Sequence, residues 1–123
     1  MTEKNTSGAT GKDGWMAYRP SIKILDCTIR DGGLINDHLF DDKLIKSVYD
    51  ACAAAGVDYI EMGYKGSRKI FSPSKYGKWK FCDENDLRAI VGEKRGTTRI
   101  SVMADAERTD YHEDILPKDK SVI

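Results

Sequence analysis

The sequence contains no long apolar stretch and carries no net charge. Its 123 residues include 20 Lys and Arg and 20 Asp and Glu, so the formal charge at pH 7 is zero. No run approaches the roughly 18 apolar residues of a membrane span, and no apolar run near the start resembles a signal peptide. A neutral total argues against proteins that coat nucleic acid or anionic membranes, because both partners select positive charge. We therefore expect a soluble, cytoplasmic protein that binds neither membranes nor nucleic acid.

Cysteine is scarce, and its spacing excludes two classes of small protein. The three residues Cys27, Cys52 and Cys82 are an odd number and form no C-x-x-C pair. A disulfide framework or a structural zinc site would need pairs. No His or Lys stands beside Cys27 in the sequence to lower the pKa of its thiol. We expect three reduced thiols that are mostly buried.

The distribution of apolar residues predicts a polar leader followed by alternating strands and helices. Residues 1–14 hold almost nothing to bury, so we predict a disordered leader over residues 1–20 and a domain over residues 21–123. Asp41 and Asp42 offer an N-cap for one helical pattern, which Gly56 ends; Asp83 caps another, which ends near Gly92 and Gly96. The predicted elements are strands at 22–29, 57–62 and 100–104 and these two helices between them.

This alternation is typical of a parallel sheet built from right-handed βαβ units. Three strands and two helices leave sheet edges unpaired and cover only part of the sheet. The apolar residues at 121–123 suggest the approach to a further strand. We therefore interpret the chain as the beginning of a larger α/β protein.

Charged residues gather where the predicted strands end. Arg30 and Asp31 end the first strand, Glu61 lies in the second, and Asp105 follows the third. Because neighbouring strands lie about 4.8 Å apart, Arg30, Asp31 and Glu61 can meet. Carboxylates there suit Mg²⁺ or Mn²⁺, and an arginine can neutralise a developing enolate oxygen. Residues 32–33, both glycine, would let the backbone turn sharply beside a ligand. A salt bridge between Arg30 and Glu61 at a solvent-facing sheet end explains the same residues without function.

Two segments resemble the DRE-TIM metallolyases, a superfamily that includes 4-hydroxy-2-oxovalerate aldolase, 3-hydroxy-3-methylglutaryl-CoA lyase and the pyruvate carboxyltransferase domains. They are residues 24–33, ILDCTIRDGG, and residues 55–63, AGVDYIEMG. The resemblance covers about residues 22–105 and is nearest to the branch of aldolase catalytic domain proteins. It implies a TIM (β/α)8 barrel of about 250 residues or more, of which this chain would supply the N-terminal three βα units.

The resemblance also implies a chemistry and roles for three residues. The activity would be a lyase or aldolase that needs Mn²⁺ or Mg²⁺ and acts on a carbon–carbon bond next to a carbonyl through an enolate. Asp31 would be a metal ligand, Arg30 would stabilise the enolate, and Glu61 would hold Arg30 and the metal-bound water in place. The substrate would be a small anionic oxo acid or an acyl-CoA.

The sequence departs from this family in two respects. The family's further metal ligands, an H-x-H pair near the end of a later strand, do not occur in this sequence. Leu34 stands where the aldolases carry a histidine base, and His38 does not match that position. Because one carboxylate does not hold a divalent ion tightly, we expect the 123-residue chain to be inactive alone.

The segment at residues 64–81 contains basic and aromatic side chains and no acid. On a barrel it would be the second βα loop, on the catalytic face. Lys65 and Arg68 are therefore candidate substrate-binding residues for a carboxylate, a phosphate or a CoA tail. The same composition suits single-stranded nucleic acid, which the neutral total charge disfavours. A solvated loop whose aromatic rings pack on the barrel rim is the alternative.

A protein of another class also fits the pattern. A truncated, non-catalytic half barrel would be a remnant or an interaction module, and its unpaired strand edges would pair with a second copy or a partner. A small flavodoxin-like domain is disfavoured, because the sequence has only three strands and no Gly-rich phosphate loop. Residues 112–114, His-Glu-Asp, suit a solvated turn better than a metal cluster.

Overall fold

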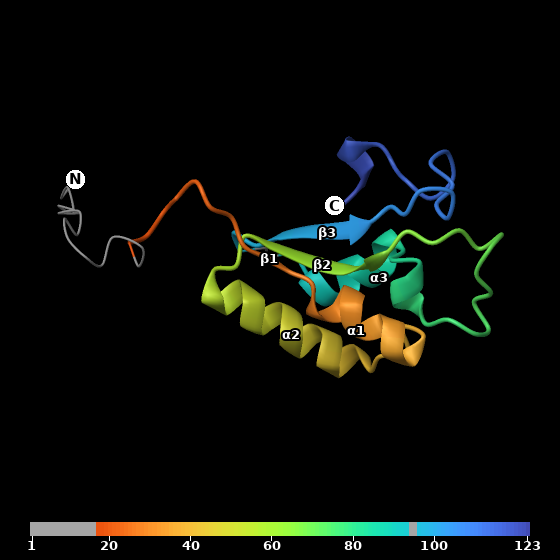
Figure 1. Cartoon of the computed structure of the whole chain (residues 1–123), viewed down its shortest axis with the longest axis horizontal. Helices are drawn as coiled ribbons and strands as arrows, with labels where there is room; N and C mark the ends of the chain where they lie inside the picture. The colour runs from red at the N-terminus through yellow and green to blue at the C-terminus, as the bar shows by residue number, and fades with distance from the viewer. Residues whose placement is uncertain (1–16, 94–95) are drawn as a thin grey trace.

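The computed structural model describes residues 17–93 and 96–123, so the predicted leader lies largely outside the described residues. The chain forms a three-stranded parallel sheet with three α-helices (Figure 1). In chain order the elements are β1 (Leu25–Asp26), α1 (Thr28–Asn36), α2 (Asp42–Ala55), β2 (Tyr59–Tyr64), the 3₁₀ turn η2 (Lys78–Lys80), α3 (Glu84–Val91), β3 (Arg99–Met103) and the 3₁₀ turn η3 (Lys118–Lys120).

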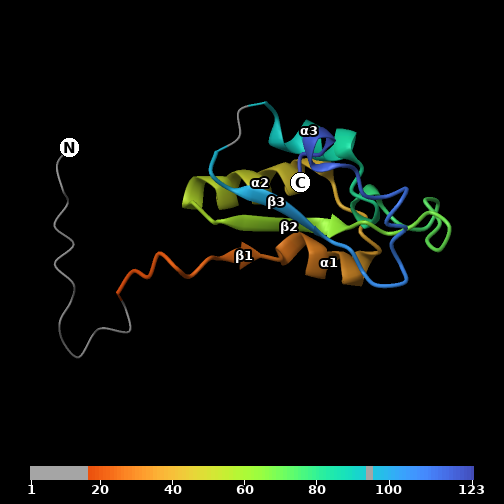
Figure 2. The ribbon, with the colours of Figure 1, turned by 90° about the horizontal axis from the view of Figure 1, so that it is seen from above.

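The sheet has the order β1-β2-β3, with β2 in the middle (Figure 2). Leu25 is paired with Tyr59, and Tyr59 in turn with Arg99, so all three strands begin in register. The expectation of parallel βαβ units is confirmed for these strands. A closed eight-stranded barrel stays a prediction.

The core lies between the sheet and the two helices α2 and α3. Alternate residues of β2, Ile60 and Met62, point into it and are fully buried. They meet apolar side chains at helical spacing on α2 and α3, which pack against each other. Glu61 therefore lies on the opposite face of β2, because successive side chains of a strand alternate. The core side chains on α2 and α3 are Ile45, Tyr49, Cys52, Leu87, Ile90 and Val91, and α1 adds Ile29.

The helix boundaries predicted for α2 and α3 are confirmed. The Asp41 carboxylate accepts a hydrogen bond from the Lys43 amide at 3.1 Å, which satisfies one free donor at the start of α2. Gly56 and Gly92 end the two helices with positive φ angles of 72° and 67°, a conformation that glycine adopts without strain.

The strand predicted at residues 22–29 is wrong for most of its length. Only Leu25 and Asp26 pair with β2, and the helix α1 begins at Thr28. The Asp26 carboxylate accepts hydrogen bonds from both the amide and the hydroxyl of Thr28, each at 3.0 Å. This local bond turns the chain out of the sheet and overrides the β-branched composition of the segment.

The glycine pair at residues 32–33 consequently lies inside a helix and forms no sharp turn. A Cβ atom added to Gly33 would lie 1.8 Å from Nδ1 of His38, whereas one added to Gly32 would meet only Phe40, at 3.5 Å. Gly33 is thus required by the close packing of the His38 ring, not by a ligand.

Other predicted elements differ little from the observed ones. Strands β2 and β3 begin and end within two residues of the predicted limits. Residues 121–123 form no strand, but Val122 is buried in the core, and its amide donates to the Glu84 carboxylate at 2.8 Å. Across residues 17–93 and 96–123, no helix has both the length and the apolar character of a membrane span.

The two glycines provide a matched test of this packing. We expect Gly33→Ala to lower the free energy of unfolding by about 1–3 kcal/mol, because the methyl group overpacks the site of His38. Gly32→Ala should raise it by up to about 1 kcal/mol, since alanine favours a helix and has room there. Urea unfolding of both variants measures the difference, and equal effects would contradict the packing role of Gly33.

Candidate active site

Arg30 and Glu61 form an ion pair between helix α1 and strand β2. The Arg30 Nε donates to Oε1 of Glu61 at 2.5 Å, and Arg30 Nη1 lies 2.6 Å from Oδ1 of Asp31. The Glu61 side chain is 9% exposed, that of Arg30 20% and that of Asp31 59%. The structure thus brings together all three residues that the sequence singled out. Arg30 lies between a buried and an exposed carboxylate.

The surroundings of Arg30 favour its cationic form. The hydrogen bond to Glu61 raises the pKa of the guanidinium above its ordinary value, and bonds to Tyr64 and Cys27 add to this, while burial acts in the opposite direction. The group therefore keeps its charge over the whole working range of pH. A fixed cation whose position is set by a buried carboxylate is suited to stabilising negative charge that develops on a ligand.

Tyr64, at the end of β2, is a neighbour of Arg30 that the sequence did not single out. Its side chain helps to raise the pKa of Arg30, and its ring makes an edge contact with His38, with the centroids 5.3 Å apart and an interplanar angle of 78°. The Nζ atom of Lys80 lies 4.2 Å from the centroid of the Tyr64 ring. Only its place one residue beyond Gly63, at the end of a predicted strand, could have indicated it.

His38 is buried beneath this cluster and is neutral. It is 2% exposed, and its Nδ1 atom has no hydrogen-bond partner among the described residues. Burial lowers the pKa of the imidazole to about 4, and the nearby charge of Lys80 acts in the same direction. Leu34, at the position of the aldolase histidine, is exposed and aliphatic. Neither His38 nor Leu34 is therefore a basic group exposed to solvent.

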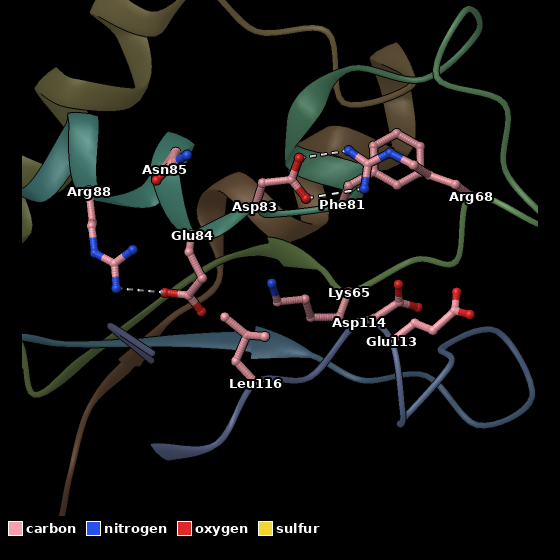
Figure 3. A pocket seen from close by; sticks show the side chains of 10 residues that line it. All are labelled: Lys65, Arg68, Phe81, Asp83, Glu84, Asn85, Arg88, Glu113, Asp114 and Leu116. Atoms are coloured by element: carbon pink, nitrogen blue, oxygen red, sulfur yellow. Dashed lines mark hydrogen bonds and ion pairs between the residues drawn. The ribbon is translucent and has the colours of Figure 1, made fainter. Parts of the chain in front are cut away.

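Lys65 and Arg68 line a different part of the molecule. They lie on a cavity of about 450 Å³ that is also bordered by α3 and by residues 113–116 (Figure 3). Arg68 donates two hydrogen bonds to the Asp83 carboxylate, at 3.1 and 2.7 Å, and Lys65 donates to the Cys82 carbonyl at 2.7 Å. Arg30, Asp31 and Glu61 do not border this cavity. The structure does not bring the two predicted groups of residues together.

Two aromatic side chains of the basic segment at residues 64–81 pack into the protein. Trp79 is fully buried and Phe81 nearly so, as expected if the aromatic rings pack on the body of the protein. Residues 112–114 form the predicted turn, in which the Asp110 carboxylate accepts from the amides of His112 and Glu113.

The cysteines differ in their surroundings. Cys52 and Cys82 are free and buried, as predicted. Burial raises the pKa of the Cys82 thiol, which makes it unreactive. Cys27 is only half-buried and lies outside the core cluster, and it helps to raise the pKa of Arg30. Cys27 directly precedes helix α1, and the first turn of the helix places Arg30 near it.

The described residues do not form a divalent-metal site by themselves. Within residues 17–93 and 96–123 no three His, Cys, Asp or Glu side chains are arranged to hold an ion. Asp31 is an exposed carboxylate with one oxygen paired to Arg30. A divalent ion of this kind usually takes several protein ligands, so this part of the chain offers one ligand at most.

Comparisons with known proteins point to aldolases. No protein-family model matches the chain. It is 33% identical over 84 residues to a 4-hydroxy-2-oxovalerate aldolase from Moorella thermoacetica, a match that includes 68% of this chain and 25% of the relative. The crystal structure of the N-terminal domain of a "putative aldolase" from Bacteroides vulgatus is similar, with a TM-score of 0.57 and 29% identity over 75% of this chain and 29% of that one.

These matches define the class as an aldolase-like α/β protein. The sequence homology is weak, and the structural similarity is to an N-terminal domain. The chain spans about a quarter of the length of the curated relative.

The unequal burial of the two carboxylates on Arg30 leads to a prediction for stability. Glu61→Gln should lower the free energy of unfolding by about 1–3 kcal/mol, because it removes the counter-charge of a half-buried guanidinium. Asp31→Asn removes the same charge at an exposed position and should cost about 0–1 kcal/mol. Urea unfolding at pH 7 compares the two, and a larger loss in Asp31→Asn would contradict the geometry.

The burial of neutral His38 predicts an acid-sensitive fold. Its pKa is about 4 when folded, against an ordinary value of 6.5, so the unfolded chain binds more protons between these values. The free energy of unfolding should therefore fall as the pH decreases from about 6.5 to 4.

His38→Asn should flatten this part of the pH profile, since asparagine does not titrate and tolerates the positive φ of 60° at this position. His112→Asn, at the exposed second histidine, is the control and should keep the slope. Denaturant unfolding between pH 4 and 7 measures both. A slope that persists in His38→Asn would show that other groups cause it.

Proposed function

We propose that the chain supplies the first three βα units of an aldolase-type carbon–carbon lyase of the DRE-TIM metallolyase superfamily, with Arg30 as the group that stabilises the enolate. The observation that carries this proposal is the Arg30–Glu61 ion pair at β2, a cation held by a buried carboxylate. The similarity to 4-hydroxy-2-oxovalerate aldolase supports a 4-hydroxy-2-oxo acid as the substrate rather than an acyl-CoA.

The chemistry of such a substrate explains why a fixed cation is useful. In aldol cleavage the 4-hydroxyl loses its proton to a base, and the bond between C3 and C4 breaks. Its electron pair forms the enolate of a 2-oxo acid, and an aldehyde leaves. Negative charge gathers on the C2 oxygen, and the guanidinium N–H groups of Arg30 would stabilise it. Glu61 would keep those donors in position, so that little reorganisation is needed during the reaction.

Besides Arg30, the reaction needs a divalent metal ion and a base. Asp31 would provide one carboxylate ligand to Mn²⁺ or Mg²⁺, and the ion would withdraw charge from the substrate oxygens. The described residues do not complete that site. Leu34 is aliphatic and the His38 ring is buried, so neither supplies the base.

A second candidate function is supported by the edges of the sheet. Strand β3 lies at one edge and the two-residue β1 at the other. Edge strands present backbone donors and acceptors that pair with another chain. A non-catalytic interaction module would use these edges and would not need the charge of Arg30.

The activity test compares two arginines. Native protein carrying this chain, assayed with Mn²⁺ for pyruvate release from 4-hydroxy-2-oxovalerate in a coupled lactate dehydrogenase assay, should lose about 10²–10³-fold in kcat/KM in Arg30→Gln. Arg19→Gln removes an equal charge from an exposed position outside the sheet and should leave the rate unchanged.

Two results would overturn the proposed function. One is a native protein that releases no pyruvate, and the other is Arg30→Gln with full activity. Self-association of the inactive protein on sizing would then favour the interaction module.

A further inference from the structure

Lys80 is a buried lysine enclosed by aromatic rings. The residue is 8% exposed, although it belongs to a type that is rarely buried. Its Nζ atom lies 4.1 Å from the centroid of Phe71, 4.2 Å from that of Tyr64 and 5.7 Å from that of Tyr76. Contacts of this kind stabilise a cation through the negative face of each ring. The rings therefore fix the position of the ammonium group and replace part of its hydration.

The described residues give this ammonium group no carboxylate partner within 4 Å. Two other lysines of the same loop have one: Lys69 pairs with Asp110 at 2.9 Å, and Lys78 with Asp42 at 2.9 Å. Burial lowers the pKa of Lys80; Asp105 acts in the opposite direction, but its carboxylate is paired with Arg108 at 3.4 Å. Buried charges in proteins are usually paired. Lys80 is therefore an unusual residue, a largely buried cation without a carboxylate partner among the described residues.

Lys80 is also close to the Arg30 site. Its carbonyl accepts a hydrogen bond from the Gly66 amide at 2.8 Å, which holds η2 beside the residues that follow β2. The Tyr64 ring contacts Lys80 on its face, and the Tyr64 side chain also acts on Arg30, whose pKa it helps to raise. Helix α1 and the turn η2, which carry Arg30 and Lys80, contact each other.

We propose that Lys80 binds the carboxylate of an anionic 2-oxo acid whose enolate oxygen lies at Arg30. This inference rests on the proposed function and adds to it the residue that selects an acid over a neutral ketone. A carboxylate at Lys80 would supply the missing counter-charge, and the aromatic rings would hold the ammonium in place before binding. Lys65 and Arg68 would not bind this carboxylate, because Lys65 already donates to the Cys82 carbonyl and Arg68 to the Asp83 carboxylate.

The test uses oxalate, a planar dianion that resembles the enolate of a 2-oxo acid, and needs no catalytic turnover. Isothermal titration of the 123-residue chain should give an oxalate affinity that falls about 10- to 100-fold in Lys80→Met, as expected for loss of a charge-assisted hydrogen bond. Methionine fits among aromatic rings. Lys80→Arg, which keeps the charge, should restore part of the affinity.

Lys75→Met is the matched control. The Nζ of Lys75 lies 5.2 Å from the centroid of the same Tyr76 ring, but the residue is exposed. The variant removes an equal charge from the same loop, and oxalate affinity should change less than about twofold. Near-ultraviolet circular dichroism, which reports the buried Trp79, checks that each variant is folded.

A second measurement needs no variant. In the wild-type chain, oxalate should shift the side-chain NMR signals of Lys80 and Arg30 and leave those of Lys75 unchanged. This outcome supports the inference even if Lys80→Met does not fold.

Three outcomes would overturn the inference: no oxalate binding by the wild-type chain, equal affinity in folded Lys80→Met, or equal loss in Lys75→Met. The proposed function fails separately, through pyruvate release that does not depend on Arg30. If Arg30→Gln abolishes oxalate binding while Lys80→Met does not, the enolate site stands and Lys80 only anchors the loop.

Discussion

The ion pair between Arg30 and Glu61 is the contact on which the arrangement of the candidate site depends. It joins helix α1 to the middle strand of the sheet and places a permanent cation over the face of β2 that points away from the core. The helix exists because Asp26 binds the backbone and hydroxyl of Thr28 after only two paired residues. A longer first strand would have moved Arg30 along the sheet, since strands rise about 3.3 Å per residue and helices 1.5 Å.

The charged side chains lie in two regions, which differ in whether the protein itself supplies each cation with a hydrogen-bond acceptor or a counter-charge. Around the cavity of Figure 3, Arg68 and Asp83 bind each other, and Lys65 binds a backbone carbonyl. Near Tyr64, by contrast, Lys80 is a buried cation that meets aromatic rings rather than a carboxylate. A ligand anion gains most where the protein has not already supplied the counter-charge. This difference favours the region near Tyr64 as the place where an acid would bind.

The relation to aldolases agrees with what the described residues supply and with what they lack. The cation and its supporting carboxylate are in contact, while a cluster of metal ligands is absent from residues 17–93 and 96–123. The chain corresponds to about a quarter of the aldolase that it resembles in sequence and to a similar share of the solved structure.

The sequence by itself determined the parallel α/β class, helices α2 and α3 with their Asp and Gly ends, and the meeting of Arg30, Asp31 and Glu61. The class and the two helices follow from caps, periodicity and alternation, which are local, and the meeting of the three charged residues follows from the adjacency of neighbouring strands. Only the tertiary structure decided that Arg30 lies on a helix, that Gly33 makes room for the His38 ring, and that Lys65 and Arg68 line a separate cavity. It also decided that Tyr64, Lys80 and Arg30 are neighbours. The energies of these contacts depend on which side chains the fold buries against one another, which no local pattern records.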